Sequence, residues 1–251
     1  TPFKSLANKG DIPDPDLNYI KFAAKAIAPV LRKGNLVILE STSPVGTTEQ
    51  LANWLAEART DLTFPENYGE NSDIRVAYCP ERVLPGHVVR ELVENDRVVG
   101  GLTSKCSETA IELYKTFVRG ECALTNARTA EMAKLTENSC RDVQIAFANE
   151  LSMICDKHDI DVFNLISLAN KHPRVDILNP GPGVGGHCIA VDPWFLVHTN
   201  KDESRLIQEA RKVNLEKTSK PGNLKFNNGY KPIPINIIKN FKKLQEKKSL
   251  I

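Results

Sequence analysis

The sequence predicts an α/β fold that contains part of a doubly wound, Rossmann-like domain. Four short segments of mostly apolar residues, typical of strands, alternate with segments in which apolar residues recur every three or four positions, the period of a helix. A much longer segment, residues 127–158, keeps the helical period and contains no Gly or Pro. The alternation indicates a parallel sheet, and a helix of that length usually crosses between domains or packs on a partner.

The elements are expected in order along the first half of the chain. Residues 17–31 have the helical period, Gly34 ends this helix, and the sequence Leu-Val-Ile-Leu at 36–39 predicts a buried strand. Residues 41–47 are expected to turn at the carboxyl end of that strand, where open α/β sheets bind ligands, and Thr47 to cap the next helix. The elements expected after it are a helix at 48–58, strands at 75–78, 98–101 and 122–125, and a helix at 104–118.

The composition is ordinary for a soluble globular protein. Hydrophobic residues make up 41% and charged residues 25% of the chain, and no apolar run approaches the ~20 residues of a membrane span. No basic-then-apolar leader is present, so neither a signal peptide nor membrane association is expected. The cysteines are widely spaced without a Cys-x-x-Cys pair, which argues against a zinc or other metal site and against a disulfide framework, and indicates a reducing cytoplasm. They are Cys79, Cys106, Cys122, Cys140, Cys155 and Cys188.

The net charge of +2 conceals an asymmetry along the chain. Residues 211–251 contain 11 Lys and Arg against two Glu, a net +9, whereas the remainder contains 22 basic and 29 acidic residues, a net −7. Nucleic-acid binding by the body of the chain is therefore not expected. Residues 220–251, rich in Lys and Asn, predict a solvated tail. A tail that binds a partner or nucleic acid, or an artefactual end, are the alternatives.

The most distinctive stretch of the chain is a glycine-rich loop at residues 179–194. Four glycines lie within the six residues 181–186, which allows the backbone to approach a ligand closely or to adopt positive φ. Cys188 follows soon after, and Asp192 comes four residues later. Backbone amides beside a thiol favour the thiolate and any oxyanion formed next to it, so Cys188 is a candidate nucleophile.

Two simpler interpretations of this loop stay open on the residues alone. The glycine spacing of residues 181–186 matches the dinucleotide fingerprint, but no apolar strand precedes it and prolines at 180 and 182 interrupt the approach. We therefore interpret the match as coincidental. Cys188 could equally be an inert small residue in a turn.

The string Gly-Gly-His-Cys-Ile-Ala-Val-Asp-Pro-Trp-Phe at 185–195 resembles the catalytic loop of the nucleotide-sugar 6-dehydrogenases, the UDP-glucose/GDP-mannose dehydrogenase family. The resemblance extends over residues 1–214 through several separated motifs. Pro-Glu-Arg-Val-Leu-Pro-Gly at 80–86 is similar to the branch that acts on UDP-N-acetylhexosamines, because the glucose branch has a second glutamate where this chain has Pro85. The resemblance implies NAD⁺ as cofactor and UDP-N-acetyl-D-mannosamine as substrate, with UDP-glucose and other nucleotide sugars as alternatives.

The resemblance also implies a covalent mechanism for a four-electron oxidation. Converting a primary alcohol to a carboxylate takes two hydride transfers, and a cysteine retains the intermediate aldehyde as a thiohemiacetal that the second transfer turns into a thioester. Cys188 matches this cysteine. Lys134 and Asn138, at i and i+4 of the long predicted helix, match the family motif Lys-x-x-x-Asn. Lys134 would polarise the sugar oxygen or stabilise the oxyanion and Asn138 would hold the hydroxyl, although the pattern alone indicates only a solvated polar face.

Further site residues follow from the same matches. Asp192 would assist the water and the lysine, Thr42 would place the catalytic water, and Glu81 would act as base in thioester hydrolysis. Without the resemblance, Asp192 and Thr42 would be turn residues. A Cys–His dyad of residues 187 and 188 is not expected, because adjacent side chains usually point apart. The implied substrate contacts are Arg141, Gly185, Gly186, His187 and, from the neighbouring subunit, Arg174; the implied cofactor contacts are Thr1, Pro2, Thr42 and Glu81.

Four regions are expected along the chain. Residues 1–126 resemble the second half of the NAD-binding domain, 127–202 the central catalytic domain with its dimer-forming helix, and 203–219 the start of the UDP-binding domain, followed by the basic tail at 220–251. The resemblance implies a fragment without the glycine-rich first half of the NAD-binding domain, which would bind NAD⁺ poorly by itself. It also implies a cytoplasmic homodimer that serves synthesis of a bacterial surface polysaccharide, such as enterobacterial common antigen or capsule. A non-catalytic dimerisation remnant is the alternative from another functional class.

Overall fold

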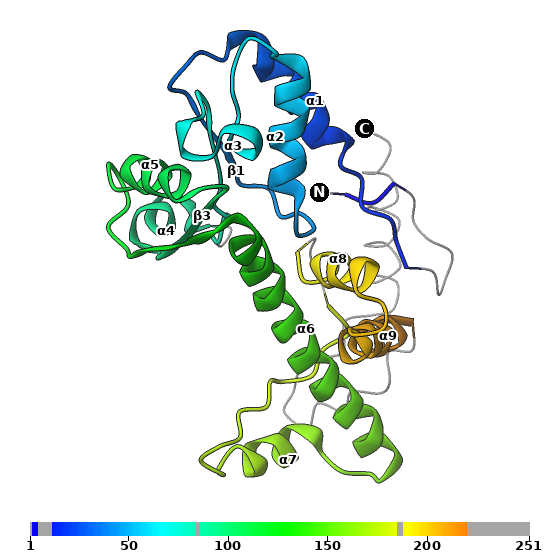
Figure 1. Cartoon of the computed structure of the whole chain (residues 1–251). Helices are drawn as coiled ribbons and strands as arrows, with labels where there is room; N and C mark the ends of the chain where they lie inside the picture. The colour runs from blue at the N-terminus through cyan, green and yellow to red at the C-terminus, as the bar shows by residue number, and fades with distance from the viewer. Residues whose placement is uncertain (1, 5–11, 84–85, 185–187, 220–251) are drawn as a thin grey trace. The chain divides into compact units, whose positions relative to one another are not determined.

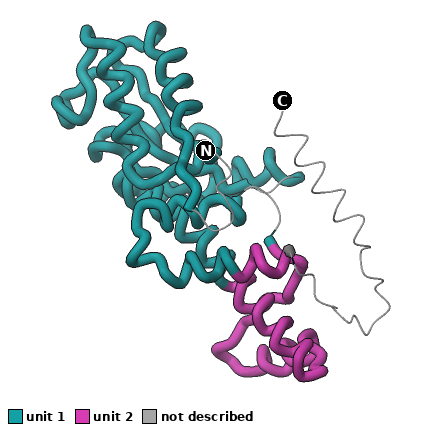
Figure 2. The backbone as a smooth tube through the Cα atoms, turned by 90° about the vertical axis from the view of Figure 1, so that its right-hand side faces the viewer, with its two compact units in different colours: residues 1–143, 184–212 teal, residues 144–183, 213–251 magenta. Residues whose placement is uncertain are grey.

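The computed structural model describes residues 2–4, 12–83, 86–184 and 188–219 (Figure 1). The chain divides into two compact units, one made of residues 1–143 and 184–212 and the other of residues 144–183 and 213–251 (Figure 2). Two helices, α6 (Ala127–Lys157) and α9 (Arg205–Ser219), contribute one end to each unit. The expected four-region division stays a prediction.

The first unit contains a four-stranded sheet in the order β1-β2-β3-β4. The strands β1 (Leu36–Leu39) and β2 (Arg75–Tyr78) are parallel, as are β3 (Arg97–Gly101) and β4 (Cys122–Asn126). The sheet is nevertheless mixed, because β2 and β3 pair antiparallel. The α-helix that the described residues form between them, α4 (Val88–Glu94), buries no residue and so does not act as a crossover packed on the sheet. The α/β class is confirmed, but the expectation of a wholly parallel sheet is wrong at this pair.

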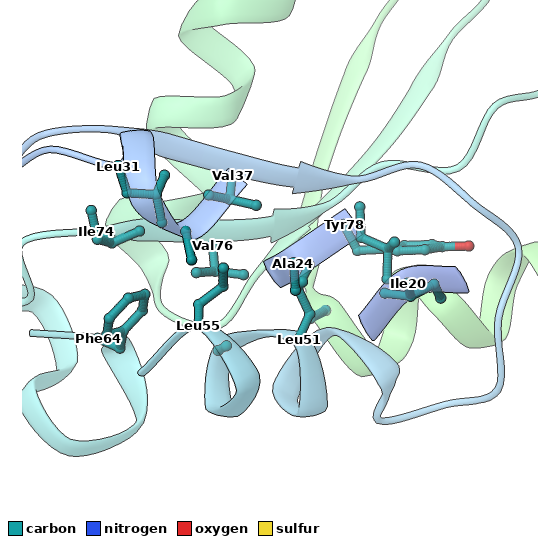
Figure 3. Packing of buried hydrophobic residues seen from close by; sticks show 14 of the residues in the cluster. Ile20, Ala24, Leu31, Val37, Leu51, Leu55, Phe64, Ile74, Val76 and Tyr78 are labelled. Atoms are coloured by element: carbon teal, nitrogen blue, oxygen red, sulfur yellow. The ribbon is translucent and has the colours of Figure 1, made fainter. Parts of the chain in front are cut away.

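One face of the sheet is covered by α1 (Asn18–Ile27) and α2 (Thr47–Ala58), which pack against each other (Figure 3). Their buried residues recur at three- and four-residue steps, which is why these segments form amphipathic helices. Each fully buried aliphatic side chain stabilises the fold by roughly 1.5–3 kcal/mol relative to an exposed one. The larger residues of this core are Ile20, Leu31, Val37, Leu39, Leu51, Leu55, Phe64, Ile74, Val76 and Tyr78.

The other face is covered by α5 (Ser104–Tyr114), whose first turn is capped by the hydroxyl of Thr103, an acceptor for the N–H of Cys106. This helix is shorter than the expected 104–118, although Val118 still packs in the core. The remaining buried residues of this layer are Ala77, Cys79, Val99, Ala110, Ile111 and Tyr114. The sheet therefore lies between two helical layers, as in a doubly wound domain.

The long helix α6 confirms the expectation for residues 127–158. A short helix that the sequence did not predict, α8 (Asp192–Thr199), packs on it through a core of Leu135, Phe195 and Leu196. The second unit packs α7 (Val162–Ala169) on the end of α6 around Cys155, Val162 and Ile166. Within the described ranges, no helix combines the length and apolarity that a bilayer span requires.

Candidate active site

A buried carboxylate joins the start of α6 to the loop that follows β1. Glu131 is fully buried and accepts hydrogen bonds from the N–H groups of Gly46, at 2.6 Å, and Thr48, at 2.8 Å, and from the Thr48 hydroxyl, at 2.6 Å. Gly46, with φ of 93°, is the N-cap of α2, so the expectation that Thr47 caps this helix is wrong. Burial raises the pKa of Glu131, and the bonds from Thr48 and Gly46 oppose the rise. The loop that carries Thr42 is thereby held against α6.

A second contact joins α6 to the loop that follows β2. Arg82 forms an ion pair with Glu137 of α6 at 2.7 Å, with both side chains about one third exposed. The neighbouring Glu81 lies 3.5 Å from the guanidinium of Arg97, a side chain that is only 3% exposed and stacks over the ring of Tyr114. Glu81 is therefore held at the sheet edge by a buried cation.

About two turns after Glu131, the polar face of α6 contacts the start of α8. The amide of Asn138 donates a hydrogen bond to the carboxylate of Asp192, which is 4% exposed. Burial raises the pKa of Asp192, whereas the hydrogen bond from Asn138 and the charge of Lys134 lower it. Three of the residues singled out in the sequence, separated by up to 58 positions, thus lie within electrostatic reach of one another.

Cys188 is exposed and begins the turn that leads into α8. Its backbone carbonyl accepts the N–H groups of Val191, at 3.1 Å, and Asp192, at 2.9 Å, and the Trp194 N–H bonds to Val191. Pro193 has no N–H. The backbone donors of Val191, Asp192 and Trp194 are therefore used within the chain, and residues 185–187 lie outside the described residues. Among the described groups, Lys134 is the one whose positive charge acts on Asp192.

The other expected site residues do not all lie in one cluster with Asn138 and Asp192. Thr42 is half-buried, and Arg141 is exposed on α6, one turn beyond Asn138. Pro2 is exposed, and its carbonyl accepts the Asp16 N–H. Arg174 is exposed in the second unit. Thr1, Gly185, Gly186 and His187 lie outside the described residues.

Two buried residues near this site were missed in the sequence. The one sequence feature that could have indicated Glu131 is its position one turn before Lys134. Its hydrogen-bond partners are at residues 46–48, far away in the sequence. Tyr78 is fully buried, and its hydroxyl has no hydrogen-bond partner within the described part of the chain. Burial and the charges of Glu131 and Asp192 raise the pKa of Tyr78. Figure 3 shows its hydroxyl directed away from the apolar cluster.

The carboxyl ends of β1 and β2 form the edge at which an α/β sheet binds a dinucleotide. Leu39 pairs with Tyr78, and Thr42 and Glu81 each follow three residues later, so both lie at this edge. The N-terminus of α2 is filled by Glu131 and does not hold a phosphate there. The edge thus fits NAD⁺ through polar side chains rather than through this helix. Over the described ranges, no three His, Cys, Asp or Glu residues are grouped to hold a metal ion.

Replacing Asp192 with asparagine should raise thermal stability at neutral pH. Because burial raises the folded-state pKa above the ordinary 3.8, the carboxyl stabilises the fold most below its unfolded pKa and loses that contribution as the pH rises through the folded value. Asparagine accepts the bond from Asn138 without ionising. The gain in Tm over the parent, followed by circular dichroism, should be larger at pH 7 than at pH 4. The exposed Asp176→Asn is the control, and a pH-independent gain would contradict the prediction.

Known proteins show the same combination of domains. The family model for the NAD binding domain of the UDP-glucose/GDP-mannose dehydrogenases matches residues 1–118, and the model for their central domain matches residues 128–216. A UDP-N-acetyl-D-mannosamine dehydrogenase of Campylobacter jejuni is 69% identical over 214 residues, 85% of this chain and 51% of that protein. An NDP-N-acetyl-D-galactosaminuronic acid dehydrogenase of Ralstonia nicotianae is 68% identical over 214 residues, 85% of this chain and 49% of that protein.

A solved structure has the same fold. The UDP-D-ManNAc dehydrogenase from Pyrococcus horikoshii is 46% identical with a TM-score of 0.74, over 81% of this chain and 47% of that one. The chain spans about half the length of the curated relatives it matches. The two matching models are domains of one family and together account for well over half of the residues. The chain therefore belongs to the UDP-glucose/GDP-mannose dehydrogenase family.

Proposed function

We propose that this chain carries the catalytic core of a UDP-N-acetyl-D-mannosamine 6-dehydrogenase, a cytoplasmic enzyme that supplies a uronate for bacterial surface polysaccharide. One nucleotide sugar, two NAD⁺ and one water would give the uronate, two NADH and three protons. The observation that carries the proposal is the bond between Asn138 and Asp192 within reach of the Lys134 charge, with Cys188 one turn before Asp192. Family membership and the names of the relatives support it.

In the first oxidation, C6 of the sugar loses a hydride and its hydroxyl group loses a proton. NAD⁺, when bound, accepts the hydride. Lys134 and Asn138 occupy one face of α6 and are suited to hydrogen-bond the C6 oxygen. The Asp192 carboxylate, held by Asn138, is the group that takes the proton, directly or through a water. A raised pKa makes Asp192 a stronger proton acceptor than an ordinary aspartate.

The aldehyde is then retained by Cys188. The exposed thiol loses its proton to solvent, and the Sγ thiolate adds to C6; a C–S bond forms, the C=O π bond opens, and the oxygen becomes the oxyanion of a thiohemiacetal. Since the amides of Val191, Asp192 and Trp194 at the start of α8 are used within the chain, we assign the stabilisation of this oxyanion to Lys134. Loss of the second hydride converts the oxyanion to a thioester carbonyl.

Water completes the reaction by attacking the thioester. The C–S bond breaks and the sugar leaves as a carboxylate, so the water loses both of its protons. In the proposed scheme the buried Asp192 carboxylate takes one of them, and the sulfur of Cys188 takes the other, which restores the thiol. Thr42 and Glu81, at the carboxyl ends of β1 and β2, would orient the water and the cofactor.

NADH formation tests the substrate proposal. The chain is assayed with NAD⁺ and, in turn, with UDP-N-acetylmannosamine, UDP-N-acetylgalactosamine and UDP-glucose, and the NADH produced per sugar consumed is measured. We expect two NADH per UDP-N-acetylmannosamine and a lower kcat/KM for the other two sugars. A higher kcat/KM for UDP-N-acetylgalactosamine would make that sugar the substrate in place of UDP-N-acetylmannosamine. If no sugar gives NADH at saturating NAD⁺, the proposed activity of this chain is refuted.

The homodimer belongs to the same proposal and is supported by an exposed apolar stripe on α6. Met132, Cys140, Phe147 and Ile154 are all exposed and lie seven or eight residues apart, which places them on one side of the helix. A second copy of this helix would cover the stripe. Phe147→Glu should convert the dimer to a monomer by light scattering, whereas Leu168→Glu, at an exposed apolar residue on α7, should not. A Phe147→Glu variant that keeps the mass of a dimer would contradict this interface.

A further inference from the structure

A buried ion pair connects α6 and α9 within the first unit. The guanidinium Nη1 of Arg211 lies 2.7 Å from Oδ1 of Asp142, and the two side chains are 3% and 0% exposed. Asp142 is one helical turn beyond Asn138 on α6. The two partners are separated by 69 positions, so no local sequence pattern points to the pair.

The same guanidinium also contacts the loop that carries the candidate nucleophile. Nη1 of Arg211 donates to the backbone carbonyl of Ile189 at 3.3 Å. Ile189 directly follows Cys188, whose own carbonyl accepts the N–H groups of Val191 and Asp192. The Ile189 carbonyl, next to Cys188, is thus tied to a charged group that cannot rotate freely, since Asp142 holds it from α6.

A gain in folding stability does not by itself explain the buried ion pair of Asp142 and Arg211. Removing two charges from water costs about as much as their attraction returns, and apolar residues of similar size often pack as well as a buried ion pair or better. A guanidinium adds something that an apolar side chain cannot. It presents several N–H donors in a fixed plane, so it can hold a carboxylate and a carbonyl in a set geometry at the same time.

We propose that Asp142 and Arg211 are positioning residues that set the backbone of residues 188–192, and through it the place of the Cys188 thiol. The inference rests on the proposed role of Cys188, which it deepens. Asp142 orients Arg211, and Arg211 restrains the Ile189 carbonyl so that the turn into α8 keeps Cys188 one turn before Asp192. Neither residue takes part in a bond-forming step.

The test compares three variants of the full chain by thermal unfolding and by amide hydrogen exchange. Arg211→Met removes the cation that faces the buried Asp142 carboxylate and should lower Tm strongly. The double variant Asp142→Leu with Arg211→Met removes both charges and should recover most of the lost Tm. If the pair acts on the loop, the amides of Val191 and Asp192 should still exchange about tenfold faster than in the parent. Exchange of the buried β2 amides is the internal control.

The variant Arg211→Lys keeps a cation opposite Asp142 but lacks the planar set of N–H donors. It provides the test if the double variant does not fold. It should keep a Tm close to the parent and still show faster exchange at residues 191 and 192. Parent-like exchange there in either folded variant would overturn the proposal. The exchange measurement needs no turnover, so it separates this inference from the proposed function: unchanged exchange refutes the positioning role even if the chain is active.

Discussion

Replacing Cys188 with alanine is expected to prevent completion of the four-electron oxidation. Without the thiol the aldehyde is not held as a thiohemiacetal, so the second hydride transfer loses its covalent substrate. The rate of uronate formation should fall by about 10³-fold or more, as when a nucleophile is removed from other covalent enzymes. The NADH formed per sugar should drop from two to one or less. Both quantities are measured together, by absorbance at saturating NAD⁺ and by chromatography of the sugar products.

The matched control is Cys140→Ala. Cys140 and Cys188 are the two exposed thiols among the described residues, but Cys140, two residues after Asn138 on α6, points to the opposite side of that helix. We expect its variant to oxidise the sugar like the parent. Two NADH per sugar at the parent rate from Cys188→Ala would refute the covalent mechanism, and equal losses in both variants would favour a general effect of thiol removal.

The second large effect is expected from Glu131→Ala, which should lower the free energy of unfolding by about 4 kcal/mol. The variant loses three hydrogen bonds and leaves the buried N–H groups of Gly46 and Thr48 without an acceptor. Each unsatisfied buried donor costs about 1–3 kcal/mol. The loop after β1 would also lose its attachment to α6. Urea denaturation followed by circular dichroism measures the change.

Two further variants show whether the carboxylate itself is responsible. Glu131→Gln keeps the shape and one acceptor oxygen but turns an amide donor toward a second N–H, so it should recover only part of the loss. Glu137→Ala removes a glutamate of the same helix from an ion pair whose side chains are about one third exposed, and should cost no more than about 1 kcal/mol. A loss for Glu131→Ala no larger than that for Glu137→Ala would show that its buried bonds do not stabilise the fold.

Much of the fold could be predicted because its signals are local. The apolar run at 36–39 and the long period at 127–158 coincide with β1 and α6 almost residue for residue. The errors arose where remote contacts decide. Gly46 replaces Thr47 as the cap of α2 because Glu131 supplies the acceptor that a capping side chain would otherwise provide. The antiparallel direction of β3 relative to β2 could not be predicted from the spacing of apolar residues, because parallel and antiparallel strands can have the same spacing.

The site divides in the same way. The sequence by itself determined that Lys134 and Asn138 share one face of a helix, because an i, i+4 spacing imposes this in any α-helix. It also placed Thr42 and Glu81 shortly after two predicted strands, 36–39 and 75–78. Only the tertiary structure decided that Asn138 meets Asp192, that Glu131 closes the end of α2, and that Arg211 reaches the Ile189 carbonyl. These contacts join residues 22 to 85 positions apart, and burial selects them by requiring each desolvated polar group to find a partner.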